Sequence, residues 1–192
     1  YDGDGRVRLS IDGTGGVSET VYDVAGRVAR QTRYAQSATL TTTLRNALVA
    51  GTATVAGVGV VASAADESVR YVYDAAGQRR YSVDATGAVS GVWYDAAGRV
   101  VATRQLSQRL SLSLVTDGIT QGQIEAAMGA GGATDAVDMF VYDGAGRVHY
   151  TLRANGDAGT YPTSVSVIET RHDGAGRVQL TQGGVRAFAQ LL

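Results

Sequence analysis

The sequence contains no cysteine and no lysine, a single proline and only two histidines. Without cysteine, the chain forms no disulfide and no thiolate metal site, although this does not identify its compartment. The one proline beside 26 glycines indicates many tight turns rather than a proline-rich linker. The formal net charge of −1 lacks the basic footprint of a general nucleic-acid binder.

A seven-residue motif, Tyr-Asp-x-x-Gly-Arg-Val, recurs along the chain and organises it. Four copies are clean, one has glutamine for the arginine and one has histidine for the tyrosine. The shared positions, which we interpret as a structural turn, are Tyr1, Asp2, Gly5 and Arg6; Tyr22, Asp23, Gly26 and Arg27; Tyr73, Asp74 and Gly77; Tyr94, Asp95, Gly98 and Arg99; Tyr142, Asp143, Gly146 and Arg147; and His172, Asp173, Gly176 and Arg177.

The motif predicts a hairpin turn. An aspartate at its second position accepts hydrogen bonds from the backbone two residues on, and the glycine three residues later adopts a positive φ, which closes a bulged hairpin. The tyrosine offers a large apolar ring, and tyrosines at one height on successive strands are expected to form cross-strand ladders. We expect the arginine to lie along the sheet or to pair with a neighbouring acid.

A related apolar-Asp-x-x-Gly unit lies between some copies of the motif. It begins at Ile11 and at Val83, ten residues after Tyr1 and Tyr73, and the next tyrosine follows eleven residues later. Between the turns are short alternating runs rich in valine, tyrosine and threonine. This pattern predicts a mainly β protein, an antiparallel strip of β-hairpins that forms a spiral, solenoid or shell segment.

Two long inserts interrupt this rhythm and define a larger period of about 70 residues, since Tyr1 to Tyr73 is 72 residues and Tyr73 to Tyr142 is 69. We predict three modules: residues 1–72, with strands over about 1–34 and an insert over about 35–68; residues 73–141, with strands over about 69–105 and an insert over about 106–138; and a partial module over 142–192.

Both inserts are predicted to contain short helices packed on one side of the sheet. Thr120 and Gln123 form a capping box before a helical segment that runs from Gln121 to Met128 and stops at Gly129, and a second helix is expected over about 42–50. The stretch 47–65 is uncharged for 19 residues. Its composition of small residues interrupted by glycine favours a buried helix or strand over a membrane span.

The sequence offers no catalytic, cofactor-binding or metal-binding constellation. His172 occupies a tyrosine position of the motif, and His149 follows a turn without neighbours that complete a ligand set. The run Asp2-Gly3-Asp4-Gly5 resembles the start of a calcium loop, but the twelfth position, which should be acidic, is Gly13. We therefore expect a protein that is not an enzyme, with no cofactor.

The recurring Tyr-Asp-x-x-Gly-Arg-Val motif closely resembles the YD repeat of bacterial RHS proteins, toxin-complex shell components and teneurins. The resemblance covers the β portions, roughly residues 1–34, 69–104, 140–153 and 168–181. It implies a continuous strip of hairpins that encloses a hollow shell, often around a toxic domain. The long inserts depart from the compact pattern of that family and resemble the modules of giant repetitive surface proteins. Asp-Pro-x-Gly-Leu, the segment of the family's self-cleaving end, does not occur in this chain.

The leading hypothesis is a structural scaffold of a secreted or cell-surface protein that forms a shell, tube or fibre. Tyr1 lies inside a motif, so we expect the sequence to be a segment of a longer chain. The alternatives are an adhesion or glycan-binding module that uses exposed tyrosine and arginine rows, and the shell of a toxin whose effector lies outside this segment. The expected partners are other repeat modules or identical copies that self-assemble, an enclosed toxin or a glycan, but not nucleic acid.

Overall fold

The computed structural model describes residues 1–129, 134–155 and 164–187. Eleven antiparallel strands form one open sheet in which every strand pairs with its neighbours in sequence. This confirms the predicted mainly β class. The strands are β1 (Leu9–Ile11), β2 (Gly16–Tyr22), β3 (Val28–Ser37), β4 (Glu67–Tyr73), β5 (Arg79–Asp84), β6 (Val89–Tyr94), β7 (Val100–Gln105), β8 (Ala136–Tyr142), β9 (Val148–Asn155), β10 (Ser164–His172) and β11 (Val178–Ala187).

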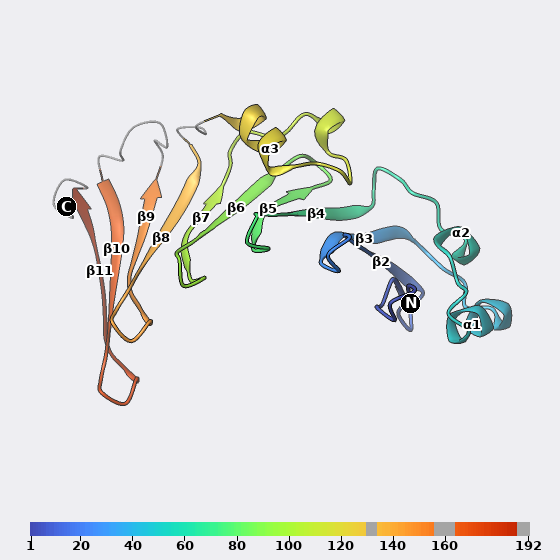
Figure 1. Cartoon of the computed structure of the whole chain (residues 1–192), viewed down its shortest axis with the longest axis horizontal. Coiled ribbons are helices and arrows are strands. Elements are labelled where there is room, and N and C mark those ends of the chain that lie inside the picture. The colour runs from blue at the N-terminus through green and yellow to red at the C-terminus, as the bar shows by residue number, and fades with distance from the viewer. Residues whose placement is uncertain (130–133, 156–163, 188–192) are drawn as a thin grey trace.

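The sheet is a curved strip with β1 and β11 at its opposite ends (Figure 1). Because side chains alternate along each strand, one face of the strip collects the apolar residues. Val83 and Val89 are fully buried on this face of β5 and β6, whereas the adjacent Ser82 and Ser90 point to the other face. The strip therefore has one covered face and one open, polar face.

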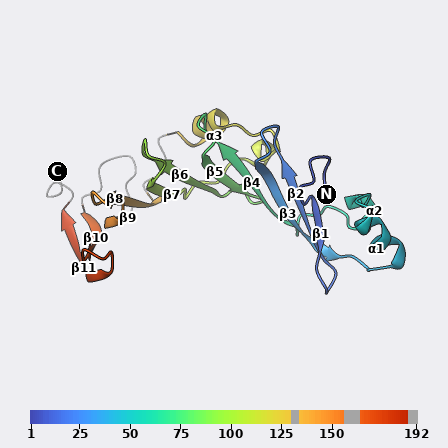
Figure 2. The ribbon, with the colours of Figure 1, turned by 60° about the horizontal axis from the view of Figure 1, so that its bottom comes forward.

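The helical inserts cover the apolar face in two places, as predicted. α1 (Thr42–Val49) and α2 (Val55–Val58) belong to the first insert, and a 3-10 turn at Leu112–Leu114 and α3 (Gln121–Met128) belong to the second. Leu44 and Val58 pack with Val17 of β2, while Ile124 and Met128 pack with the core of β4 to β6. Figure 2 shows the two helical groups at separate places along the strip.

The stretch 47–65 is only partly the buried helix or strand that its composition predicts. α1 ends at Val49 and α2 is four residues long. Within this stretch Val58 and Val60 are buried, whereas Val49 and Val61 are 91% and 68% exposed. In the described part of the chain, no helix is long and apolar enough to cross a membrane. Residues 156–163 and 188–192 of the predicted third module lie outside the described residues.

The connections between strands separate onto two edges of the strip. All six copies of the motif, which we call corners, join or precede strands at one edge, the corner edge. The short turns at Asp12 and Asp84 and both inserts lie at the opposite edge, the insert edge. In Figure 1 the hairpins that end at the corner edge hang below the sheet, and α3 lies above it. The inserts thus lengthen the chain without touching the corner edge.

Candidate functional site

Each corner is closed by one aspartate, as the corner at Asp95 shows. The Asp95 carboxylate accepts hydrogen bonds from the backbone N–H groups of Ala97 and Arg99, both at 2.9 Å, and from Nε of Arg99 at 2.7 Å. These bonds, led by that from the Arg99 backbone, hold the pKa of Asp95 below its ordinary value. Gly98 has a φ of +78°, so the predicted turn chemistry is confirmed.

The same arrangement recurs at the other corners. The aspartate of each corner accepts bonds from the N–H groups two and four residues on, and the arginine pairs with the second carboxylate oxygen at 2.7 to 2.8 Å wherever arginine is present. The glycines with positive φ at these corners are Gly5, Gly26, Gly77, Gly98, Gly146 and Gly176.

Neighbouring corners are linked through arginine and tyrosine. The guanidinium of Arg6 lies 4.4 Å from the ring centroid of Tyr22 in the next corner, and that of Arg99 lies 4.6 Å from the ring centroid of Tyr142. The same contact joins Arg27 to Tyr73. The tyrosine hydroxyl in turn donates to a backbone carbonyl of the preceding corner, as Tyr142 does to Val100 at 2.6 Å. We call this series of contacts the corner ladder.

The corner ladder corrects the expected stacking of tyrosine on tyrosine. Among the described residues, the aromatic pairs are Tyr81 with Trp93 and His149 with Tyr150, and neither joins two motif tyrosines. A cationic guanidinium over the ring supplies a cation–π attraction of about 0.5–1 kcal/mol at an exposed site. The motif tyrosines after Tyr1 are accordingly half-buried beside the corners instead of buried in the core.

The ladder continues past both inserts, because Arg27 reaches β4 and Arg99 reaches β8 from the far side of each insert. It is weakened at two steps. Gln78 replaces arginine in the third corner, and its Nε2 approaches Gly98 without a charge to place on a ring. His172 replaces tyrosine in the sixth corner, where Arg147 instead donates to the carbonyl of Asp173 at 3.3 Å.

Replacing Gln78 with arginine should complete the third corner and stabilise the chain by about 0.5–1 kcal/mol. The new guanidinium would pair with Asp74, which accepts bonds from the backbone N–H groups of Ala76 and Gln78, and would cover the ring of Tyr94. Chemical denaturation measures the change in unfolding free energy. The reverse substitution, Arg99→Gln, serves as the matched control and should cost a similar amount; a Gln78→Arg variant no more stable than wild type would contradict the cation–π role.

At the insert edge, each insert is bound near its start by one short turn of the sheet. Asp12 and Asp84 bond to the hydroxyl and N–H of a threonine two residues on. The carbonyls of Gly15 and Gly87 then each accept a 2.8 Å bond from an insert backbone N–H, from Ala38 and Leu110 respectively. Both members of the second pair lie 72 residues after those of the first (87 − 15 and 110 − 38). The two inserts are therefore anchored in the same way.

An aspartate at the end of each insert closes its base. Asp66 accepts a 2.9 Å bond from the N–H of Ala35, and Asp135 accepts a 2.8 Å bond from the N–H of Ser107. Each aspartate lies seven residues before a motif tyrosine, and Ala35 and Ser107 are again 72 residues apart. Sequence reasoning missed these two residues, although this fixed spacing from the motif was a signal that could have revealed them.

A polar cleft lies on the covered face between the two inserts, over β3 and β4. Its cavity of about 580 Å³ is bordered by the first insert at Ala62–Ala64 and by the second at Leu112 and Val115. Arg30 and Arg70 lie on its floor, where they pair directly across the two strands. This cleft was not predicted from the sequence. The available signal was the arginine at positions 30 and 70. The positions that lie beside them on β5 and β6 are occupied by Val83 and Val89.

The charges in this cleft form a network that reaches across the fold. Arg30 bonds Glu19 of β2 at 2.9 Å and Asp117 of the second insert at 2.6 Å, and Asp117 also bonds Arg70 at 3.1 Å. Burial acts to lower the pKa of Arg30, but the two carboxylates outweigh it and raise this pKa. Burial and the bond that its hydroxyl donates to Glu19 raise the pKa of Tyr34 to about 12.

The two histidines lie apart from this cleft. His149 of β9 contacts Glu169 of β10 at 3.3 Å, and His172 lies at the sixth corner. In the part of the chain that the structure describes, no three acidic or histidine side chains converge as a metal site requires.

No protein-family model and no curated protein sequence matches this chain. Among solved structures, it is similar to chains in "Crystal Structure of TcdB2-TccC3", "Crystal Structure of TcdB2-TccC3-Cdc42" and "Crystal Structure of TcdB2-TccC3-TEV", with 16%, 15% and 14% identity and TM-scores of 0.40, 0.40 and 0.39. The matches cover 90%, 90% and 88% of this chain, which spans 8% of the length of each of those chains. With such TM-scores, these similarities carry no argument about function.

Proposed function

We propose that the chain is a non-enzymatic structural segment of a large secreted or cell-surface protein of the YD-repeat type, in which the strip forms part of a wall. The observation that carries this proposal is the corner ladder. A chain that builds one corner six times and links each corner to the next is making a continuous edge, whereas a catalytic site needs one unique constellation.

The two faces of the strip support a role as a wall. The inserts cover one face over apolar clusters, and the open face presents polar side chains such as Gln31 and Arg33 of β3. Tyr71 donates to Gln31 at 3.0 Å across the open face, so neighbouring strands are also tied there. Such a sheet separates two spaces, as a shell or tube requires, and an open strip of this kind extends by adding modules.

The alternative of glycan binding along tyrosine and arginine rows loses support from this geometry. The rings of Tyr22, Tyr73 and Tyr142 are each covered on one side by an arginine. Each of these arginines is also paired with the aspartate of its own corner. A sugar that stacked on that side would have to displace a cation–π contact. We therefore assign the rows to the wall itself.

Electron microscopy of the full-length natural protein tests the proposal. A hollow shell, a tube or a fibre with a thin wall is expected, and the image distinguishes among these assemblies. A compact, solid particle would overturn the scaffold assignment. Digestion by protease added to intact cells, or recovery from the medium, tests the location separately; a protein protected inside intact cells would contradict it.

A further inference from the structure

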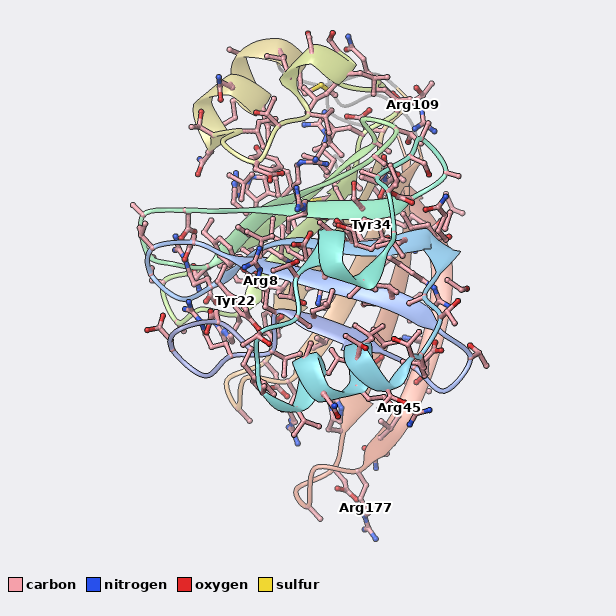
Figure 3. The ribbon with its side chains drawn as sticks, turned by 90° about the vertical axis from the view of Figure 1, so that its right-hand side faces the viewer. Arg8, Tyr22, Tyr34, Arg45, Arg109 and Arg177 are labelled. Carbon is pink, nitrogen blue, oxygen red and sulfur yellow. The ribbon has the colours of Figure 1, made fainter. Side chains whose placement is uncertain are left out.

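The cleft between the inserts places two arginines of neighbouring strands, Arg30 and Arg70, directly opposite each other on the covered face. Under the first insert the sheet carries Val17, and under the second it carries Val83 and Val89. Between these clusters, the same face carries Arg30 and Arg70. Figure 3 shows Tyr34 at this level of the strip, below the second insert. Two neighbouring guanidinium groups repel each other and are costly to bury, so this pair calls for a separate explanation.

The Asp117 carboxylate already occupies the place of an anion between these two guanidinium groups. Its oxygens lie 2.6 Å from Nη1 of Arg30 and 3.1 Å from Nε of Arg70. Asp117 comes from the loop before α3 and is 48% exposed, whereas Arg30 and Arg70 are 22% and 15% exposed. The basic pair is therefore built into the sheet, and its acidic partner stands on a loop at the surface.

We propose that this cleft binds a small hydroxylated carboxylate of the size of one sugar acid, whose carboxylate takes the place of Asp117 on Arg30 and Arg70. Guanidinium groups bind the two oxygens of a carboxylate through paired N–H bonds. The cavity of about 580 Å³ lies within the range of small-molecule sites, about 300–1,000 Å³. This binding goes beyond the proposed scaffold role and does not depend on it.

The rest of the lining suits a hydroxylated ligand. Thr32, Ser68 and Thr86 line the cleft, and small apolar side chains of the inserts and of Ala85 leave room for the carbon frame of a ring. The Ser68 hydroxyl accepts a bond from Arg70 at 3.2 Å and the Thr86 hydroxyl donates to Asp84 at 2.6 Å, so Thr32 is the first of the three to offer its hydroxyl to a ligand. Asp66 also borders the cleft, but its carboxylate already accepts bonds from the N–H groups of Ala35 and Ser63. Its capacity for further ligand contacts is accordingly reduced.

Calorimetric titration with sodium glucuronate tests the proposal, and uncharged glucose serves as the matched ligand. Asp117→Asn removes the competing carboxylate and should tighten glucuronate binding at least tenfold relative to wild type. Asp138→Asn makes the same chemical change at an ion pair with Arg153 on the open face and should leave the affinity unchanged. Glucose should not bind any of the three proteins.

The site is overturned if Asp117→Asn binds glucuronate no more tightly than wild type, or if glucose binds equally well. Inorganic phosphate, which lacks a carbon frame, should bind at least tenfold more weakly than glucuronate; equal affinity would mean an unspecific cation pair. Arg70→Gln should abolish binding. If that variant fails to fold, the comparison of Asp117→Asn with Asp138→Asn decides on its own.

Fluorescence of the single tryptophan gives an independent reading. Trp93 packs against the apolar core that the second insert covers. Asp117 is part of the same insert. Displacement of Asp117 by the ligand loosens the second insert from β3 and β4, so saturating glucuronate should shift the Trp93 emission of the wild type. An unchanged emission in a protein that binds by calorimetry would contradict displacement of Asp117.

Discussion

Replacing Gly87 with alanine is expected to destabilise the protein by about 3 kcal/mol, whereas the same change at Gly98 should cost about 1 kcal/mol. Both glycines have a left-handed backbone, with φ of +81° and +78°. Alanine is therefore strained by a similar amount at either position. They differ in their surroundings. A Cβ at position 87 would lie 2.4 Å from the carbonyl oxygen of Leu110, while at position 98 the nearest atom is Nε2 of Gln78 at 3.3 Å.

The difference arises because the Gly87 turn holds the second insert. Leu110 donates its N–H to the Gly87 carbonyl and is itself 4% exposed in the core, so its backbone cannot move away without opening that core. The side chain of Gln78, by contrast, can swing aside. Denaturation of the two variants under identical conditions gives the comparison, and equal losses of stability would show that the insert is not fixed at Gly87.

Removing the carboxylate of Asp135 is expected to cost about 3–5 kcal/mol. Asp135 is 2% exposed, and its oxygens lie 2.7 Å from Nε of Arg104 and 2.8 Å from both the N–H and the hydroxyl of Ser107. Asp135→Ala would leave the charge of Arg104 at a mostly buried place without this partner and open the base of the second insert.

Asp138→Ala is the control for Asp135→Ala. Asp138 lies three residues further on and pairs with Arg153, whose side chain is 63% exposed, so its loss should cost less than about 1 kcal/mol. Thermal or urea unfolding measures both variants. A loss at Asp135 as small as that at Asp138 would show that the insert is held by its apolar contacts alone.

Much of the fold followed from the sequence because its signals are local. A turn at Asp95 and Gly98 depends on residues within the motif, and the capping box at Thr120 and Gln123 depends on one helical turn. The pairing of β2 with β3, β4 with β5 and β6 with β7 followed as well, because a short turn holds two consecutive strands side by side. The short 3-10 turn at Leu112–Leu114 was missed, because it lacks an N-terminal cap bond.

The contacts between elements could not be read in the same way. The reach of Arg6 to Tyr22 depends on the spacing of neighbouring hairpins, and the bond of Arg30 to Asp117 joins residues 87 positions apart. Such contacts are fixed by sheet curvature and by the path of each insert, for which one sequence carries no period. The tyrosines were accordingly placed on one another when arginine in fact lies between successive corners.

Each insert is bound to a turn glycine near its start and through an aspartate at its end. The segment between these two points therefore behaves as an exchangeable cassette. The bonds that define its two ends, at Gly15 with Ala38 and at Ala35 with Asp66 in the first insert, involve none of the residues of α1 or α2. Evolution or an engineer can rewrite the helices between these anchors, provided that an apolar face still meets Val17. Diversity in such proteins should therefore accumulate along a single margin of the strip.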